Sequence, residues 1–250
     1  MLRRVSLLLA LGACAHAAPV ARAPIPAPPR VIVAAVAESD PTDVVPKPEA
    51  PLVTSCREVA HVGDSTSVGL MPRIEARYRE VGVERFLPEI SGARSMYETY
   101  RGRPNATTIV RRMRAEGYRG CWVMALGTND PANTRGNLVV LRARIDAMMS
   151  LVGSAPALWM TSKTLKARGA YRNANMENWN EVLVAACKRH PNMRVYDWAS
   201  EVMDSWFTSD GVHFNGAGNR ERGARIAKAL ARAFPEDGAP PASCVVHSFE

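Results

Sequence analysis

Four short polar segments of this 250-residue chain carry the side chains best suited to catalysis. In chain order they are Gly63-Asp64-Ser65, Ser91-Gly92-Ala93-Arg94, Gly127-Thr128-Asn129-Asp130 and Asp210-Gly211-Val212-His213. A serine hydroxyl becomes an effective nucleophile when a neighbouring base takes its proton, and an imidazole held by a carboxylate is a suitable base. Together, the serine, histidine and aspartate of these segments predict acyl transfer.

Each of these residues has a role in that chemistry. Ser65 is the candidate nucleophile, His213 the general base, and Asp210 the carboxylate that orients the imidazole from three residues upstream. The backbone N–H groups of Ser65 and Gly92 and the side-chain amide of Asn129 could supply three donors to the oxyanion of a tetrahedral intermediate. Taken singly, His213 could be an ordinary histidine and Asn129 a turn residue. The occurrence of all four segments in one order favours the catalytic interpretation.

Other residues near these segments are candidates for substrate contact. Trp206 and Phe207 come just before the acid of the triad and could stack on a sugar ring or flank an acyl chain, or could instead fill the core. Tyr97 is a third candidate, in one of the loops 95–101, 133–135, 163–173 and 205–207 that we expect to face the site. Asp64 and Asp130 are interpreted as loop braces. We predict neither a metal nor a cofactor.

A regular alternation of apolar runs and helical periodicities must position the four segments. Strands are predicted at 59–62, 86–90, 121–126, 157–160 and 194–197, and helices at 70–80, 107–116, 138–152, 176–189 and 218–234. This alternation predicts an α/β domain with a parallel sheet covered by helices on both faces. The candidate segments then follow the carboxyl ends of the strands, where such sheets gather their chemistry.

In this order the four segments resemble the motifs of the SGNH hydrolase superfamily, also called the GDSL-like lipases and esterases. The resemblance covers roughly residues 59–234. It implies a serine esterase with a flavodoxin-like three-layer α/β/α sandwich and a five-stranded parallel sheet. It also implies a triad of Ser65, Asp210 and His213 and an oxyanion hole of Ser65, Gly92 and Asn129. Thr66 departs from the family, in which an apolar residue is more usual, and this weakens any inference of a lipid substrate.

The N-terminal residues predict export. Residues 1–17 have the layout of a signal peptide: Arg3-Arg4 precedes an apolar run, and Ala15-His16-Ala17 is a small-x-small cleavage site. Alternatively, Leu11-Gly12-Ala13-Cys14 resembles a bacterial lipobox, and Cys14 would become the lipidated first residue and a membrane anchor. Either form predicts a bacterial protein that is periplasmic, attached to the cell envelope, or secreted.

The export signal precedes a spacer and the folded domain. Residues 18–55 are rich in proline and alanine, which predicts a disordered, extended linker. Residues 56–250 form the predicted catalytic domain. No run approaches the roughly 20 apolar residues of a membrane-spanning helix.

Four cysteines remain for the exported domain, an even number in an oxidising compartment: Cys56, Cys121, Cys187 and Cys244. Four cysteines allow three pairings. Because Cys56 and Cys244 bracket the domain, we favour the pairs Cys56–Cys244 and Cys121–Cys187. No two of the four have C-x-x-C spacing, which argues against zinc.

The formal charge of the chain is +8 and its pI about 9.6. No nucleic-acid-binding motif accompanies this charge, so we expect no nucleic-acid partner; the positive field suits an anionic envelope surface or substrate. We expect a monomer. Three functions remain open. The first is an exported esterase for short, acetyl-like O-acyl esters, such as those on envelope carbohydrate. The second is an O-acyltransferase that uses the same triad with a sugar hydroxyl as acceptor, and the third is a non-catalytic wall-binding lipoprotein.

Overall fold

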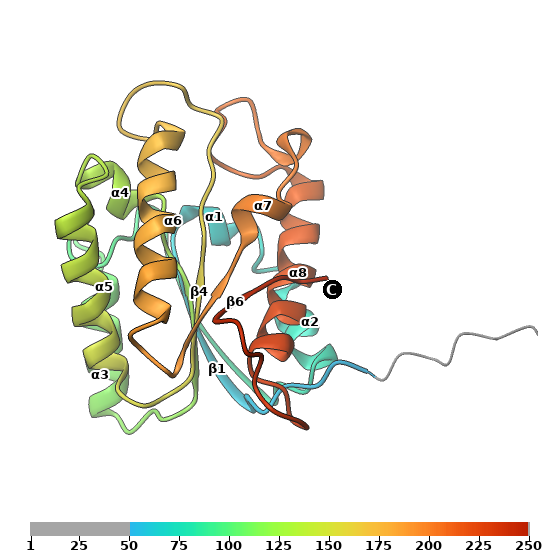
Figure 1. Cartoon of the computed structure of the whole chain (residues 1–250). Helices are drawn as coiled ribbons and strands as arrows, with labels where there is room; N and C mark the ends of the chain where they lie inside the picture. The colour runs from blue at the N-terminus through green and yellow to red at the C-terminus, as the bar shows by residue number, and fades with distance from the viewer. Residues whose placement is uncertain (1–50, 250) are drawn as a thin grey trace, which may run out of the picture. The chain divides into compact units, whose positions relative to one another are not determined.

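The computed structural model describes residues 51–249 (Figure 1). The predicted signal peptide, the lipidation candidate Cys14 and nearly all of the predicted linker lie outside the described residues. Within the described part, no helix is long and apolar enough to cross a membrane.

Strands and helices alternate along the described chain. The strands are β1 (Glu58–Gly63), β2 (Arg85–Ile90), β3 (Cys121–Ala125), β4 (Ala157–Met160), β5 (Met193–Tyr196) and β6 (Val245–Val246). The helices are α1 (Ser65–Val68), α2 (Ile74–Glu80), α3 (Ala106–Ala115), α4 (Asn129–Asn133), α5 (Leu138–Val152), α6 (Asn173–Cys187), α7 (Trp198–Glu201) and α8 (Gly216–Ala233), with a 3₁₀ turn η1 (Asp204–Trp206). The ten predicted elements are present with ends that differ by a few residues, except that the helix predicted at 70–80 begins only at Ile74.

The sheet is parallel throughout, in the order β2-β1-β3-β4-β5-β6. The predicted three-layer α/β/α sandwich is therefore confirmed, but the predicted number of five strands is wrong. The sixth strand, β6, is only two residues long, and it pairs with β5 through bonds such as that from Asp197 N to Val246 O (3.0 Å). So short a run carries no periodic signal in the sequence.

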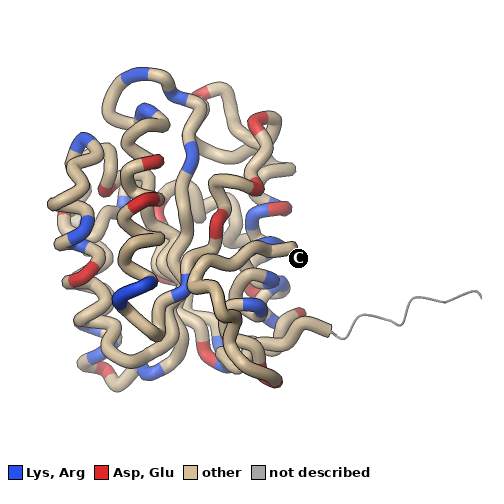
Figure 2. The backbone as a smooth tube through the Cα atoms, in the orientation of Figure 1, with Lys and Arg blue, Asp and Glu red and all other residues tan. Residues whose placement is uncertain are grey.

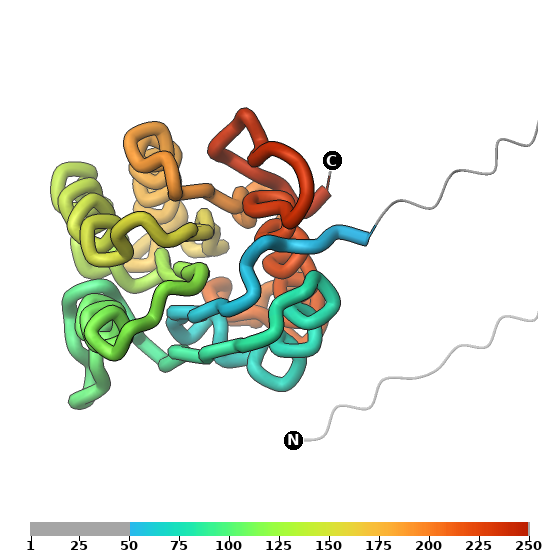
Figure 3. Tube along the Cα trace, turned by 90° about the horizontal axis from the view of Figure 1, so that it is seen from below, coloured from blue at the N-terminus to red at the C-terminus, as the bar shows by residue number. Residues whose placement is uncertain are grey.

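Helices cover both faces of the sheet. Figure 2 shows that the charged residues lie mostly on these helices and on the loops, and the central strands β3 and β4 contain none. Figure 3 shows α3, α5 and α6 on one side of the strands and α2 and α8 on the other. Three of these helices begin with an asparagine whose side chain accepts a backbone N–H of the first turn: Asn105 for α3, Asn137 for α5 and Asn215 for α8.

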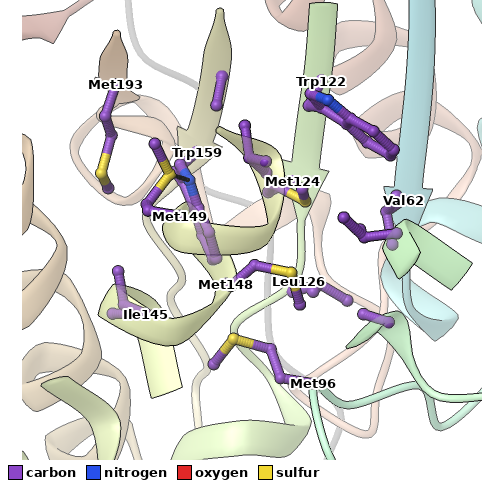
Figure 4. Packing of buried hydrophobic residues seen from close by; sticks show 14 of the residues in the cluster. Val62, Met96, Trp122, Met124, Leu126, Ile145, Met148, Met149, Trp159 and Met193 are labelled. Atoms are coloured by element: carbon purple, nitrogen blue, oxygen red, sulfur yellow. Dashed lines mark hydrogen bonds between the residues drawn. The ribbon is translucent and has the colours of Figure 1, made fainter. Parts of the chain in front are cut away.

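Two hydrophobic clusters, one on each face, hold the layers together. Every residue of β3 is buried, and alternate residues contribute to opposite clusters: Trp122 and Met124 to one, Val123 to the other. Figure 4 shows the first cluster, where Met148 and Met149 of α5 lie among the side chains of the strands. The burial of all five residues confirms the prediction that this strand is covered on both faces. Helices on both sides of a parallel sheet leave its central strands no face in contact with solvent.

The folded part begins earlier than predicted. Thr54 N donates to Val81 O and Ser55 N to Phe234 O, both at 2.9 Å, and Thr54 is fully buried. Residues at the end of the predicted linker therefore pack against the ends of α2 and α8. Placing the boundary at residue 55 was wrong, because composition does not report backbone hydrogen bonds made with distant segments.

The favoured disulfide pairing was also wrong. The bonds are Cys56–Cys121 and Cys187–Cys244. Cys56 precedes β1 and Cys121 opens β3, and these two strands are neighbours, with Val59 opposite Cys121 in the register. The second bond ties the end of α6 to the residue before β6. The order of strands in the sheet, which sequence position does not reveal, decides both pairs.

Replacing Cys187 and Cys244 together by serine should lower the free energy of unfolding by roughly 2–4 kcal/mol. The bond closes a loop of 57 residues and ties the residue before β6 to the end of α6. Urea unfolding of the variant and of wild type measures the difference. Addition of a reductant to wild type should reproduce this loss at least in part, and an unchanged midpoint in the variant would contradict the prediction.

Candidate active site

A tight turn between β1 and α1 carries the candidate nucleophile. Asp64 caps α1: its Oδ1 accepts from Thr66 N (2.8 Å) and from Thr66 Oγ1 (2.7 Å). Any side chain at Gly63 would meet Ser67, since a Cβ there would lie 2.6 Å from Ser67 Oγ. Ser65 is left half-buried at the carboxyl end of β1. Thr66 is the polar residue at the position where the family pattern has an apolar one. Its hydroxyl donates to Asp64 Oδ1, which accounts for a polar side chain here. Asp64 thus braces the loop, as the sequence predicted.

The three predicted triad residues form one hydrogen-bonded chain. His213 Nε2 lies 2.9 Å from Ser65 Oγ, and His213 Nδ1 lies 2.6 Å from Asp210 Oδ2. The other oxygen, Asp210 Oδ1, accepts from Val212 N (2.8 Å), His213 N (2.9 Å) and Thr208 Oγ1 (2.8 Å). Partial burial alone would raise the pKa of Asp210, but the hydrogen bonds from His213, Val212 and Thr208 lower it below its usual range. The carboxylate therefore stays charged beside the imidazole.

The turn between η1 and α8 sets the acid and the base side by side. Thr208 N donates to His213 O (2.8 Å), and Gly211 N donates to Thr208 O (2.9 Å). Gly211 has a φ of 67°, in the left-handed region that favours glycine, and this lets the chain reverse between Asp210 and His213. His213 reaches a serine 148 residues earlier in the sequence because the end of β1 and the turn before α8 lie at the same edge of the sheet.

The loop after β2 carries the second candidate segment. Ser91 N donates to Gly63 O (3.1 Å), which holds this loop against the end of β1, two residues before Ser65. Gly92 is half-buried, and none of the hydrogen bonds within residues 51–249 uses its N–H. The only atom within 4 Å of the place a Cβ would occupy is Arg103 Nη1, at 3.8 Å. The N–H of Gly92 is thus free to donate, as an oxyanion-hole residue requires.

Asn129, the third predicted oxyanion donor, is the first residue of the short helix α4 and is buried. Its Nδ2 donates to Arg94 O (3.0 Å), and its Oδ1 accepts from the Tyr171 hydroxyl (3.2 Å). The side chain therefore joins the loops that follow β2, β3 and β4. The adjacent Asp130 accepts from Met96 N (3.0 Å) and Arg144 Nη1 (2.9 Å), the brace that the sequence predicted. Burial raises the pKa of Asp130 to about 7, although the bonds from Arg144 and Met96 oppose the rise.

Two of the three predicted substrate contacts are wrong. Trp206 stacks on Trp198 with ring centres 5.9 Å apart, and Phe207 packs against Phe214 at 4.9 Å. Both residues are buried in the second hydrophobic cluster, so the core-filling alternative holds for them. Tyr97 is exposed, and its ring lies 5.3 Å from the guanidinium carbon of Arg144.

Tyr171 is the site residue that the sequence did not single out. The loop 163–173 was expected to face the site, but no residue in it was chosen, because only the tertiary structure brings the Tyr171 hydroxyl to Asn129. The same loop contacts the triad turn, since Leu165 N donates to Gly211 O (2.7 Å). Figure 1 shows the two loops next to one another above the sheet. Among the described residues, no group of three or more His, Cys, Asp or Glu side chains could hold a metal ion.

Comparisons with known proteins bear on the fold. No protein-family model and no curated protein matches the chain by sequence. Among solved structures, it is similar to a lipase/acylhydrolase from Enterococcus faecalis, with 18% identity, a TM-score of 0.57 and coverage of 73% of this chain and 100% of the other. It is similar to the C-terminal catalytic domain of peptidoglycan O-acetyltransferase A from Streptococcus pneumoniae (18% identity, TM-score 0.56, coverage 72% and 97%). It is also similar to a carbohydrate acetylesterase from Sinorhizobium meliloti (19% identity, TM-score 0.52, coverage 71% and 100%).

These neighbours span a lipase/acylhydrolase, an acetylesterase and an acetyltransferase domain, and other matching structures are described as GDSL-like or SGNH proteins. At such low identity the likeness establishes the fold. The resemblance predicted from the four motifs is therefore confirmed at that level: this chain has the three-layer fold of the SGNH hydrolases.

Proposed function

We propose that the protein is an exported serine esterase that hydrolyses short O-acyl esters, acetyl above all, on carbohydrate of the cell envelope. The observation that carries the proposal is the continuous chain of hydrogen bonds from Asp210 through His213 to Ser65. A separated set of the same residues could not perform acyl transfer, whereas these three are joined by hydrogen bonds.

In the proposed reaction, Ser65 Oγ attacks the acyl carbonyl carbon while its proton passes to His213 Nε2. Asp210 stabilises the imidazolium that forms. The N–H groups of Ser65 and Gly92 and the Asn129 amide stabilise the oxyanion. His213 then gives its proton to the leaving sugar oxygen, and the acyl group remains on Ser65. A water molecule, deprotonated by His213, attacks the acyl-enzyme. His213 then returns this proton to Ser65 Oγ as the bond from Ser65 to the acyl group breaks, which releases the carboxylic acid and restores Ser65.

Two observations support a small acyl group on a large alcohol. The side chains of His213 and Asp210 are 44% and 49% exposed, which fits an open site that admits a bulky alcohol. Two structural neighbours are a carbohydrate acetylesterase and a peptidoglycan O-acetyltransferase domain. Full-length protein should hydrolyse an activated acetyl ester faster than its long-chain counterpart and should release acetate from an acetylated polysaccharide. The reverse chain-length preference would contradict the substrate assignment.

Unpaired cations next to the candidate segments support an anionic carbohydrate. The loop 161–172 contains four basic residues and no acidic one, and Figure 2 shows basic residues along this loop. Lys163 is paired with Asp204 (2.7 Å), but Lys166 has no acidic partner among the described residues. Its Cδ lies 3.3 Å from the place a Cβ would occupy at Gly211, inside the triad turn. Arg103, beside Gly92, likewise has no acidic partner there; its Nη1 donates to Ser91 Oγ (3.2 Å).

The double variant Arg103→Gln with Lys166→Gln should raise KM for an acetylated acidic polysaccharide by about 3- to 10-fold at low salt. KM for a small neutral acetyl ester should not change, because that substrate carries no charge for the two cations to attract. Added salt should erase the difference, since it screens exposed charges. Arg111→Gln, at an exposed position on α3, is the control. Equal KM values for variant and wild type on the acidic polymer would refute this substrate preference.

A second function, O-acyl transfer to a sugar hydroxyl, uses the same residues. It is supported by the peptidoglycan O-acetyltransferase domain among the structural neighbours. The two reactions differ only in what attacks the acyl-enzyme. Product analysis with an acyl donor, with and without a sugar acceptor, separates them: acetate alone indicates the esterase and an acetylated acceptor the transferase. The joined triad gives no support to the non-catalytic wall-binding alternative.

Export is part of the proposal. The basic and apolar start of the chain supports it, and two disulfides among the described cysteines fit an oxidising compartment. We propose a periplasmic, envelope-bound or secreted location in a bacterium. Fractionation of cells that express the full chain or its Cys14→Ser variant tests the anchor: a lipoprotein moves from the membrane to the soluble fraction when Cys14 is replaced.

A further inference from the structure

The side-chain amide of Asn129 has one fixed orientation. The carbonyl of Arg94 can only accept, so the amide nitrogen must face it, at 3.0 Å. The amide oxygen then faces Tyr171, whose hydroxyl donates to it across 3.2 Å. Of the two N–H bonds on Nδ2, one serves Arg94 O, and the other has no acceptor within the described chain. That remaining N–H is the one available to an oxyanion.

Tyr171 is held firmly although the residue is exposed (39%). Its carbonyl accepts from Thr164 Oγ1 (2.7 Å), and Thr164 N donates in turn to Asn173 Oδ1 (2.9 Å). Asn173 N donates to Lys166 O (2.7 Å), and this bond joins the two ends of the loop segment 166–173. Burial, the Asp64 carboxylate and the Tyr100 hydroxyl all raise the pKa of Tyr171, so its hydroxyl keeps the proton that it donates.

We propose that Tyr171 is a positioning residue for the oxyanion hole: its hydroxyl donates to Asn129 Oδ1 and so orients and polarises the amide whose free N–H stabilises the transition state. Hydrogen bonds in a chain strengthen one another, and donation to the oxygen of an amide makes its N–H groups better donors. The inference rests on the proposed function, because it assigns Tyr171 a part in that same acyl transfer. This role of Tyr171 also assigns a function to the loop after β4, which carries it to the site.

Tyr171→Phe tests this role because it removes one oxygen atom and keeps the ring. Loss of one neutral hydrogen bond of this kind should lower kcat by about 3- to 10-fold and leave KM nearly unchanged. Tyr118→Phe is the matched control: the Tyr118 hydroxyl donates to Cys121 O (2.6 Å) at the first residue of β3, away from the carboxyl ends of the strands that carry the triad. The control should retain wild-type kcat. A loss that appears in KM alone would overturn the proposal in favour of direct substrate contact.

A double-mutant cycle shows whether the hydroxyl acts through Asn129. If it does, Tyr171→Phe should have less than about a 2-fold effect on kcat in an Asn129→Ala background. An undiminished effect in that background would overturn the proposal. The inhibition constant of a small alkylboronic acid, which forms a tetrahedral adduct with an active serine, should rise by the same factor as kcat/KM falls. A change confined to thermal stability would indicate a merely structural tie.

One readout is independent of turnover. The side-chain NH₂ signals of Asn129 in ¹⁵N-labelled protein should shift in Tyr171→Phe and remain in place in Tyr118→Phe. Unshifted signals would show that the hydrogen bond does not form in solution and would overturn the inference. Absence of Ser65-dependent hydrolysis in the wild-type protein would instead defeat the proposed function, so the two failures are distinguishable.

Discussion

Ser65→Ala should lower kcat for an acetyl ester by about 10⁴-fold or more. The variant loses the atom that forms the acyl-enzyme, and His213 is left with no hydroxyl to deprotonate at the 2.9 Å contact. Whatever rate remains should come from the oxyanion donors and from substrate binding. Initial rates with an activated acetyl ester measure the effect, and mass spectrometry after brief mixing should detect an acetyl adduct on wild type only.

The fold should tolerate this change, because Ser65 is half-buried and its hydroxyl has no hydrogen-bond partner except His213 among the described residues. The thermal midpoint of the variant should therefore match that of wild type. Ser205→Ala is a suitable control, since Ser205 is exposed in the segment before the triad turn. Equal turnover by Ser65→Ala and wild type would remove the basis of the proposed mechanism.

Asp210→Asn should lower kcat by about 10²- to 10⁴-fold through the tautomer of His213. Asp210 Oδ1 accepts from Val212 N, His213 N and Thr208 Oγ1, and the amide oxygen of an asparagine would take over this place. The amide NH₂ would then face His213 Nδ1, which must become an acceptor. The imidazole proton moves to Nε2, and Nε2 can no longer accept the proton of Ser65.

This argument predicts an intact structure with a disabled base. The thermal midpoint should change little, because the three bonds that hold the turn are kept. Asp204→Asn is the control: it alters an exposed carboxylate of the same segment, one paired with Lys163 and not with the triad. Retention of more than about a tenth of wild-type kcat by Asp210→Asn would show that Asp210 does not set the tautomer.

Much of the architecture followed from local patterns. The continuous apolar run of β3 indicated a strand covered on both faces, and the apolar spacing of α8 indicated a helix that faces a core. Asp210 and His213 are close in sequence, so their contact follows from one turn and could be predicted from their spacing. The short helix α4 and the strand β6 were missed because neither is long enough to show a period.

The apolar patterns of the sequence by themselves predicted the alternating order of strands and helices. The polar segments after the strands placed five residues at one edge of the sheet: Ser65, Gly92, Asn129, Asp210 and His213. Only the tertiary structure decided the contacts between distant segments that no motif predicts. It paired Cys56 with Cys121 because β1 and β3 are neighbours, placed Trp206 and Phe207 in the core, and brought Tyr171 to Asn129. The physical reason is that periodicity reports which face of one element is buried, whereas contacts between distant loops depend on the order of strands and the direction of each side chain.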